Sequence, residues 1–165
     1  MNMNKKYNLG VIGPGSNYSK KFHHIFEKKF KNIFILRKNS KSYKNKTTFT
    51  DSDIFFNQKL DLIYISTPPK SNLFYIKKCL DKNIPTICEK PAIIHFDDNN
   101  KNLLKRIKES KSIFIENFSY TSHKIFNDLH KIVNKNSISF VKSSFQYPFL
   151  EKKNFRYKNN GFFFD

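Results

Sequence analysis

Short, continuous apolar segments alternate along most of this chain with segments in which apolar residues recur every three or four positions. A short apolar run is typical of a strand buried on both faces of a sheet, and the three-to-four spacing is typical of an amphipathic helix. The predicted strands are residues 7–12, 33–36, 62–65, 86–88 and 113–115, and the predicted helices are residues 19–30, 71–82, 97–109 and 122–133, with a short helix after Asp51 or Ser52. This alternation predicts an α/β fold with a parallel sheet and helices on both faces.

The pattern changes near residue 120. From Ile138 the apolar residues alternate with a period of two, which predicts a half-exposed strand of a different sheet. We therefore expect a first domain at residues 1–120. Residues 121–165 are then a connecting helix and the incomplete start of a second, α+β domain.

A glycine loop lies between the first predicted strand and the first predicted helix. Its glycines are Gly13 and Gly15, followed by Ser16 and Asn17. Gly13 would permit the tight turn, Gly15 would let the backbone approach a pyrophosphate, and the helix N-terminus would supply free N–H groups. Ser16 and Asn17 could hydrogen-bond phosphate. This arrangement predicts a Rossmann-type dinucleotide-binding domain, although a plain glycine turn without nucleotide fits the loop equally well when it is taken alone.

The end of the second predicted strand bears on the choice of dinucleotide. NAD sites usually place an acidic residue there to bind the ribose hydroxyls. This chain has Arg37 and Lys38, with Ser40 close by, and no acidic residue. Arg37 and Ser40 would suit a 2′-phosphate, so the sequence favours NADP over NAD. The alternative is that the two basic residues are simply solvated.

The net charge is +18, which raises the possibility of a nucleic-acid partner. However, arginine, the preferred residue for phosphate and base contacts, occurs at only three positions, Arg37, Arg106 and Arg156. The lysines are spread along the chain, and abundant Lys, Asn, Ile and Phe are what an A+T-rich gene encodes. Nucleic-acid binding is therefore the least favoured hypothesis.

The chain shows no sign of a membrane or secretory protein. No apolar run approaches the ~20 residues of a membrane span, and the apolar stretch near the N-terminus is too short for a signal peptide. The only cysteines are Cys79 and Cys88, too few for a disulfide scaffold. The five histidines show no metal-ligand spacing. We expect a cytoplasmic protein with no metal site.

Two motifs follow neighbouring predicted strands. Thr67-Pro68-Pro69 ends the strand at 62–65, and Glu89-Lys90-Pro91 ends the strand at 86–88. With the glycine loop before them, these motifs resemble those of the glucose–fructose oxidoreductase and inositol dehydrogenase (Gfo/Idh/MocA) family. The resemblance covers nearly the whole chain, including Phe118-Ser-Tyr120 before the connecting helix.

The resemblance implies a nicotinamide-dependent dehydrogenase that acts on a sugar, sugar nucleotide or cyclitol. Lys90 would lie between cofactor and substrate and assist proton transfer at the reacting oxygen. Glu89 would lie near the nicotinamide ribose, and Thr67 and Pro68 would line the cofactor cleft. Asp165 matches a family aspartate that a catalytic histidine follows four residues later, and the sequence given ends at Asp165.

The chain departs from the family pattern at two positions. Tyr18 stands where the third small residue of the glycine loop is expected, and Asn72 replaces a histidine that commonly follows the Pro-Pro turn. Tyr120 and Arg156 are the only candidate substrate contacts. In the family, the second domain covers the substrate and supplies subunit contacts, so a homo-oligomer is expected of the whole protein.

Two other hypotheses compete with that of a catalytic dehydrogenase. The chain could be a nucleotide-binding module or remnant without catalysis, because the matching histidine is not in the sequence. It would then bind a dinucleotide and transfer no hydride. A nucleic-acid-binding protein would instead show affinity that falls steeply with salt.

Overall fold

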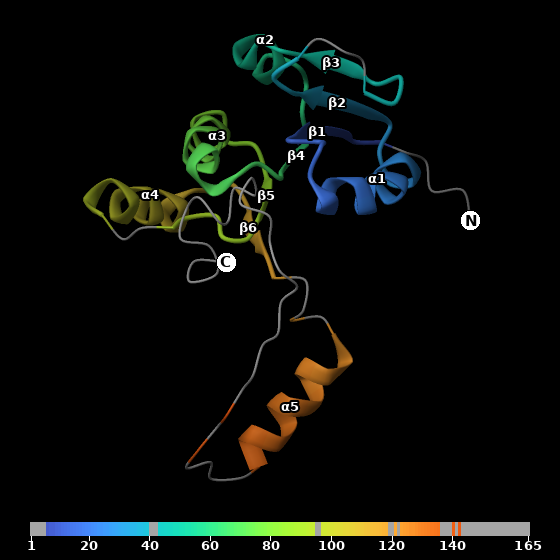
Figure 1. Ribbon diagram of the computed structural model, residues 1–165. Helices are drawn as coiled ribbons and strands as arrows, with labels where there is room; N and C mark the ends of the chain where they lie inside the picture. Colours follow the sequence, from blue (N-terminus) through green and yellow to red (C-terminus); the bar gives the residue numbers. More distant parts are fainter. Residues whose placement is uncertain are drawn as a thin grey trace, which may run out of the picture. The chain divides into compact units, whose positions relative to one another are not determined.

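The computed structural model describes residues 6–39, 43–94, 97–118, 121, 123–135, 140 and 142. Six parallel strands form one sheet in the order β3-β2-β1-β4-β5-β6 (Figure 1). Their bounds are β1 (Asn8–Ile12), β2 (Asn32–Leu36), β3 (Thr47–Phe49), β4 (Leu62–Ile65), β5 (Thr86–Glu89) and β6 (Phe114–Asn117). The strand order reverses at β1, which pairs with both β2 and β4. Ligands bind such sheets at this reversal, beyond the carboxyl ends of the strands.

Helices cover both faces of the sheet (Figure 1). The helices of the first unit are α1 (Asn17–Lys29), α2 (Ser52–Phe56), α3 (Pro69–Asp81) and α4 (Asp98–Glu109). Apolar residues of α2, α3 and α4 pack on one face, around Phe55, Ile76 and Leu103. On the other face, Phe22 and Phe26 of α1 pack against strand residues of β1, β2 and β4. The predicted α/β fold, a Rossmann-type parallel sheet with helices on both faces, is confirmed.

The core of the sheet is built from the predicted apolar runs. Ile35, Ile63 and Ile65 are completely buried, and Leu9 and Val11 are at most 1% exposed. Alternate residues of one strand enter opposite faces, so β1 contributes Ile12 to one core and Val11 to the other. Both faces are apolar because helices cover both, which explains why these strands read as continuous apolar runs.

Helix starts follow the predicted caps in two cases and not in a third. Asp51 caps α2 and Asp97 caps α4, each accepting hydrogen bonds from backbone amides of its helix. Helix α3 was predicted to start at residue 71, but it begins at Pro69, directly after Pro68, and has no side-chain cap. A proline at the first helical position has a suitable φ and no N–H to satisfy, so the helix can start at the Pro-Pro turn.

One strand was missed by sequence reasoning. β3 has three residues and pairs in parallel with β2 at the edge of the sheet. Phe49 packs edge-to-face on Phe55, with ring centroids 6.0 Å apart, and lies 6.2 Å from the ring of Phe34. Three residues carry too little hydrophobic periodicity to be recognised, so only the tertiary contacts of Phe49 identify this strand.

The chain divides into two units, Met1–Asn117 and Phe118–Asp165. In the second, α5 (Lys124–Lys135) is amphipathic, with Ile125, Leu129 and Val133 at the three-to-four spacing that predicted it. The strand predicted from Ile138 lies outside the described residues.

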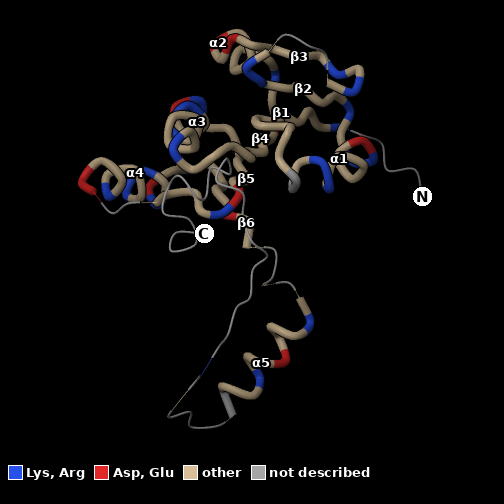
Figure 2. Tube along the Cα trace, viewed as in Figure 1, with Lys and Arg blue, Asp and Glu red and all other residues tan. Residues whose placement is uncertain are grey.

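Basic side chains are not gathered on one element. Lys residues occur on α1, α3, α4 and α5, and acidic residues share each of these helices (Figure 2). Among the described residues, no helix has the length and apolarity that a membrane crossing requires.

Candidate functional site

The turn between β1 and α1 depends on Gly13. This residue has φ +80°, and a Cβ built on it would lie 2.5 Å from the carbonyl oxygen of Ser66. Only glycine fits a backbone that is both left-handed and this close to its neighbour. The Gly13 amide also donates to the carbonyl of Leu36, at 3.4 Å. The backbone of the loop is thus hydrogen-bonded to the end of β2 and lies too close to the residue after β4 for a side chain at residue 13.

Gly15 differs from Gly13 in its surroundings. A Cβ built on Gly15 would meet no atom within 4 Å. The described structure therefore does not need glycine there, and the open space lies next to the N-terminus of α1. No acidic residue occupies the first turn of that helix. An anion such as a pyrophosphate fits this position, because the helix end presents free N–H groups and the positive end of the helix dipole.

Ser16 caps α1. Its Oγ accepts a hydrogen bond from the Ser19 amide at 2.9 Å and also hydrogen-bonds the Oγ of Ser66. The predicted phosphate contact of Ser16 would therefore share an oxygen that already holds the helix start and the end of β4. Asn17 is the first residue of α1.

Arg37 directly follows β2, where sequence reasoning placed a cofactor contact. Its guanidinium lies over the ring of Tyr43, 5.7 Å from the centroid. The Tyr43 hydroxyl in turn donates to the carbonyl of Pro14, at 2.8 Å. Tyr43 therefore links the residue beside β2 to the glycine loop. Sequence reasoning missed it, because it lies between the predicted elements, where no motif or periodicity marks a residue.

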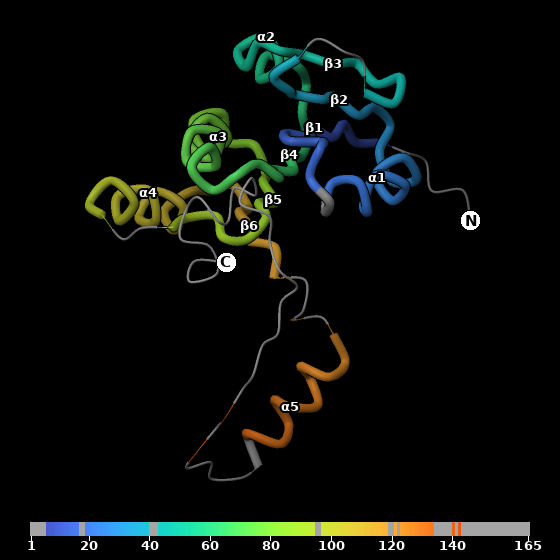
Figure 3. The backbone as a smooth tube through the Cα atoms, viewed as in Figure 1, coloured from blue at the N-terminus to red at the C-terminus, as the bar shows by residue number. Residues whose placement is uncertain are grey.

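The Thr-Pro-Pro turn and the Glu-Lys-Pro turn are joined by one buried side chain (Figure 3 shows the path from β4 through α3 to β5). Asn72 on α3 is 1% exposed. It accepts a hydrogen bond from Thr67 Oγ1 at 2.7 Å and donates to the carbonyl of Pro91 at 3.2 Å. Asn72 does not cap the helix; it holds the two motif-bearing turns together. The sequence marked this position only as a departure from the family pattern.

Glu89 is the last residue of β5 and is only 6% exposed. Its Oε1 accepts hydrogen bonds from Tyr64 Oη at 2.5 Å and from Asn117 Nδ2 at 2.6 Å. Burial and the neighbouring Glu89 carboxylate raise the pKa of Tyr64 far above its ordinary value, so the phenol is neutral and acts as the donor. Neither partner of Glu89 was identified from the sequence.

Lys90 follows Glu89 at the carboxyl end of β5. The segment after it is tied to β6, because Glu116 Oε1 accepts a hydrogen bond from the Ala92 amide at 2.7 Å. With Asn72 on the Pro91 carbonyl, the backbone on the C-terminal side of Lys90 is held from two directions. The structure thus brings Gly13, Thr67, Pro68, Glu89 and Lys90 to the ends of three adjacent strands, β1, β4 and β5.

Four predicted site residues lie outside the described residues: Ser40, Tyr120, Arg156 and Asp165. The cysteines add no nucleophile to the site. Cys79 and Cys88 are both buried and unpaired. Burial raises the pKa of Cys79 to about 12 and raises that of Cys88 as well, so both thiols stay protonated near neutral pH.

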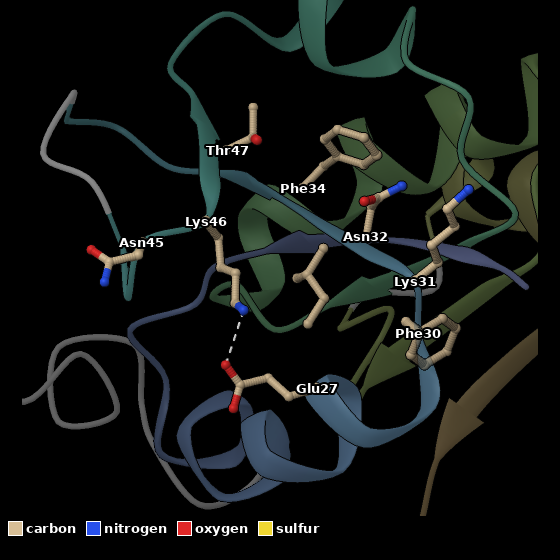
Figure 4. A pocket seen from close by; sticks show the side chains of 9 residues that line it. Glu27, Phe30, Lys31, Asn32, Phe34, Asn45, Lys46 and Thr47 are labelled. Carbon is tan, nitrogen blue, oxygen red and sulfur yellow. Dashed lines mark ion pairs between the residues drawn. The ribbon is translucent and has the colours of Figure 1, made fainter. Parts of the chain in front are cut away.

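A pocket of about 250 Å³ lies elsewhere, at the amino ends of β2 and β3 (Figure 4). Lys31 and Asn32 line it beside β2, and Lys46 and Thr47 line it beside β3. Lys46 Nζ forms an ion pair with Glu27 Oε1 at 3.0 Å. The pocket lies at the amino ends of the strands, whereas the glycine loop lies at the carboxyl end of β1. The charge of Lys46 is already balanced by the Glu27 carboxylate. The pocket is therefore not the candidate site.

The strand order, the glycine loop and the open N-terminus of α1 define a dinucleotide-binding α/β protein. A family model described as "Oxidoreductase family, NAD-binding Rossmann fold" (GFO_IDH_MocA) matches residues 7–118, more than half of the chain. The chain belongs to this family, as the sequence resemblance predicted. No curated protein matches the chain.

Solved structures with the same fold include the following three proteins. Myo-inositol 2-dehydrogenase from Lactobacillus plantarum is 22% identical, with a TM-score of 0.69 over 79% of this chain and 42% of that one. The WlbA dehydrogenase from Thermus thermophilus, in complex with NAD and α-ketoglutarate, is 12% identical, with a TM-score of 0.67 over 80% and 48%. GenD2 from gentamicin A biosynthesis, in complex with NAD, is 11% identical, with a TM-score of 0.68 over 79% and 39%. The chain matches less than half the length of each.

Proposed function

We propose that this chain is the cofactor-binding part of an NAD(P)-dependent dehydrogenase that transfers a hydride to or from a sugar, sugar nucleotide or cyclitol. One observation carries the proposal: Gly13 leaves no room for a Cβ beside the Ser66 carbonyl, while a Cβ on Gly15 would meet open space next to the N-terminus of α1. A loop of this shape would leave space for a pyrophosphate at the helix N-terminus. Two solved structures of the same fold contain NAD.

Residues at the ends of β4 and β5 would complete the site. When bound, the nicotinamide accepts or supplies two electrons as a hydride. In the direction of reduction, the carbonyl carbon of the substrate gains the hydride and its oxygen gains a proton. Lys90 Nζ would hydrogen-bond that oxygen and supply the proton, because an ammonium group stabilises a developing alkoxide. Thr67 and Pro68 would line the cleft, and Glu89 would bind a hydroxyl of the nicotinamide ribose.

The other functional residues belong to the second unit. Asp165 would join Lys90 in the catalytic set, and Tyr120 and Arg156 would contact the substrate. We also propose that the cofactor-binding domain ends near residue 120, where the connecting helix and the start of the second domain begin. A reducing, cytoplasmic compartment agrees with the two buried free thiols.

The test is a titration of the full chain with NADH and with NADPH, in which nicotinamide fluorescence measures binding. We expect micromolar affinity for at least one of them, and Gly15→Asp should abolish it, because the new carboxylate would occupy the pyrophosphate position and repel it. The fold should survive, since a side chain at residue 15 meets no atom. Asn99→Asp is the matched control, because it adds a carboxylate to the exposed first turn of α4. Loss of binding in the control, or no binding by the unmodified chain, would refute the proposal.

We further propose that NADP is the preferred dinucleotide. Arg37 follows β2 with its guanidinium against Tyr43, and within the described residues no acidic side chain follows this strand before β3. A guanidinium binds a 2′-phosphate strongly, because the two groups have opposite charges. The ribose hydroxyls of NAD are neutral and gain no such charge interaction, which disfavours NAD. Arg37→Gln should weaken NADPH binding about tenfold and leave NADH binding within twofold. Equal or tighter binding of NADH by the unmodified chain would refute this preference.

A further inference from the structure

Glu89 is held in an asymmetric way. Both of its donors, the Tyr64 hydroxyl and the Asn117 amide, bond the same oxygen, Oε1. Among the described residues, none donates a hydrogen bond to Oε2. When one oxygen of a carboxylate accepts two hydrogen bonds, the rotamer of the side chain is fixed. The second oxygen keeps the capacity to accept further hydrogen bonds.

The three residues come from three adjacent strands. Glu89 and Asn117 are partners in the β5–β6 register, and Tyr64 lies on the neighbouring β4, which pairs with β5. Tyr64 is 3% exposed and its ring packs edge-to-face on Phe22 and Phe26 of α1, with centroids 6.4 and 5.2 Å away. The aromatic packing fixes the direction of the phenol, and the strand pairing fixes the direction of the amide. Glu89 cannot turn away without losing two hydrogen bonds in a buried position.

Burial of this carboxylate requires a reason beyond stability. A carboxylate removed from water costs free energy that two neutral donors offset only in part, and an apolar residue would pack there at no such cost. The position also lies one residue before Lys90, at the carboxyl end of the sheet. A buried carboxylate that is held rigidly at the ligand-binding end of a sheet is typical of a binding site in which further side chains fix the ligand-contacting residue.

We propose that Tyr64 and Asn117 are positioning residues, which fix Glu89 through Oε1 so that Oε2 receives a hydroxyl of the nicotinamide ribose. This inference rests on the proposed function. It predicts that the two residues affect the nicotinamide half of the cofactor and not the adenine half.

The experiment compares NADH or NADPH, whichever binds more tightly, with ADP. ADP carries the adenine half and the pyrophosphate but has no nicotinamide ribose. Tyr64→Phe removes only the hydroxyl and keeps the ring, and Asn117→Leu keeps the branched shape of the side chain and removes the amide donor. Each should weaken binding of the dinucleotide about tenfold, the scale of one hydrogen bond to a charged group, and leave ADP binding within twofold. Tyr75→Phe, which alters a half-buried tyrosine on α3, is the matched control and should change neither.

A double-mutant cycle shows whether the two residues act through Glu89. In a Glu89→Ala background, Tyr64→Phe should have no further effect on dinucleotide binding, because the group it positions is gone. Additive effects would overturn the inference. So would equal losses for ADP and the dinucleotide, which would indicate a purely structural role, or no loss in either variant. If one variant does not fold, the other still decides the outcome. If the unmodified chain binds ADP but no dinucleotide, the inference fails with the nicotinamide site; if it binds neither, the proposed function itself fails.

Discussion

The two sides of the candidate site are built by different means. On the β1–β2 side, the glycine loop is shaped by backbone geometry: Gly13 is pressed against the Ser66 carbonyl, and its amide bonds Leu36. On the β4–β5–β6 side, the ends of the strands are joined by buried side chains, with Asn72 between two turns and Glu89 between two strands. A backbone constraint depends on one residue type at one position. A side-chain constraint depends on pairs that lie far apart in the sequence.

This difference explains which parts of the site can be predicted. Gly13 and Gly15 were identified from their spacing after the first predicted strand, and Gly13 has a conformation that glycine adopts far more readily than other residues. Asn72, Tyr64 and Asn117 were not identified, because an asparagine or tyrosine in a strand or helix is compatible with many roles. Their partners are 19, 25 and 28 residues away. The following changes test the contrast between the two sides, from the largest expected effect to the smallest.

Gly13→Ala should have the largest effect. The new methyl group would lie 2.5 Å from a backbone oxygen and would force an L-residue into a left-handed conformation. We expect a loss of about 3 kcal/mol in the free energy of unfolding, measured with urea, together with loss of dinucleotide binding. Gly15→Ala is the matched control and should change stability by less than about 0.5 kcal/mol, since its methyl group meets no atom. Equal losses in the two variants would contradict the distinct roles of these glycines.

Asn72→Leu tests the side-chain constraint on the other side of the site. Leucine has the same branched shape but leaves Thr67 without its acceptor and the Pro91 carbonyl without its donor. We expect a loss of about 2 kcal/mol in unfolding free energy. Under the proposed function, kcat of the dehydrogenase should also fall, since the turn that carries Lys90 loses its support. Asn99→Leu, at an exposed position of α4, should cost less than about 0.5 kcal/mol. A stable Asn72→Leu variant would show that the turns hold their positions without this link.

Tyr43→Phe asks whether the glycine side also relies on a side chain. The variant keeps the ring against Arg37 and removes the hydroxyl that donates to the Pro14 carbonyl. The loss should be about 1 kcal/mol, the value of one partly buried hydrogen bond. A loss as large as that of Gly13→Ala would remove the contrast between the two sides. Thermal unfolding with and without ADP would measure both stability and binding.

The pH dependence of stability should show the smallest effect, through His23. This side chain is 3% exposed, and burial, then the charges of Lys44 and Lys46, lower its pKa below the ordinary 6.5 even though Glu27 opposes the shift. The unfolded chain therefore binds the proton more readily, so stability should fall as the pH drops below about 6.5. His23→Phe should flatten this part of the curve, whereas His24→Phe, at the adjacent exposed position, should not. An unchanged slope in His23→Phe would contradict the assignment.

The sequence by itself determined the α/β class, five of the six strands, the glycine turn and the two motifs at strand ends. Hydrophobic periodicity and backbone sterics act over a few residues, so they can be read from local spacing. Only the tertiary structure decided that β3 joins the sheet, that Asn72 bridges the two motif turns, and that Tyr64 and Asn117 meet on one oxygen of Glu89. Each of these depends on which strands become neighbours, and the crossover connections of a parallel sheet bring together residues that no local pattern relates.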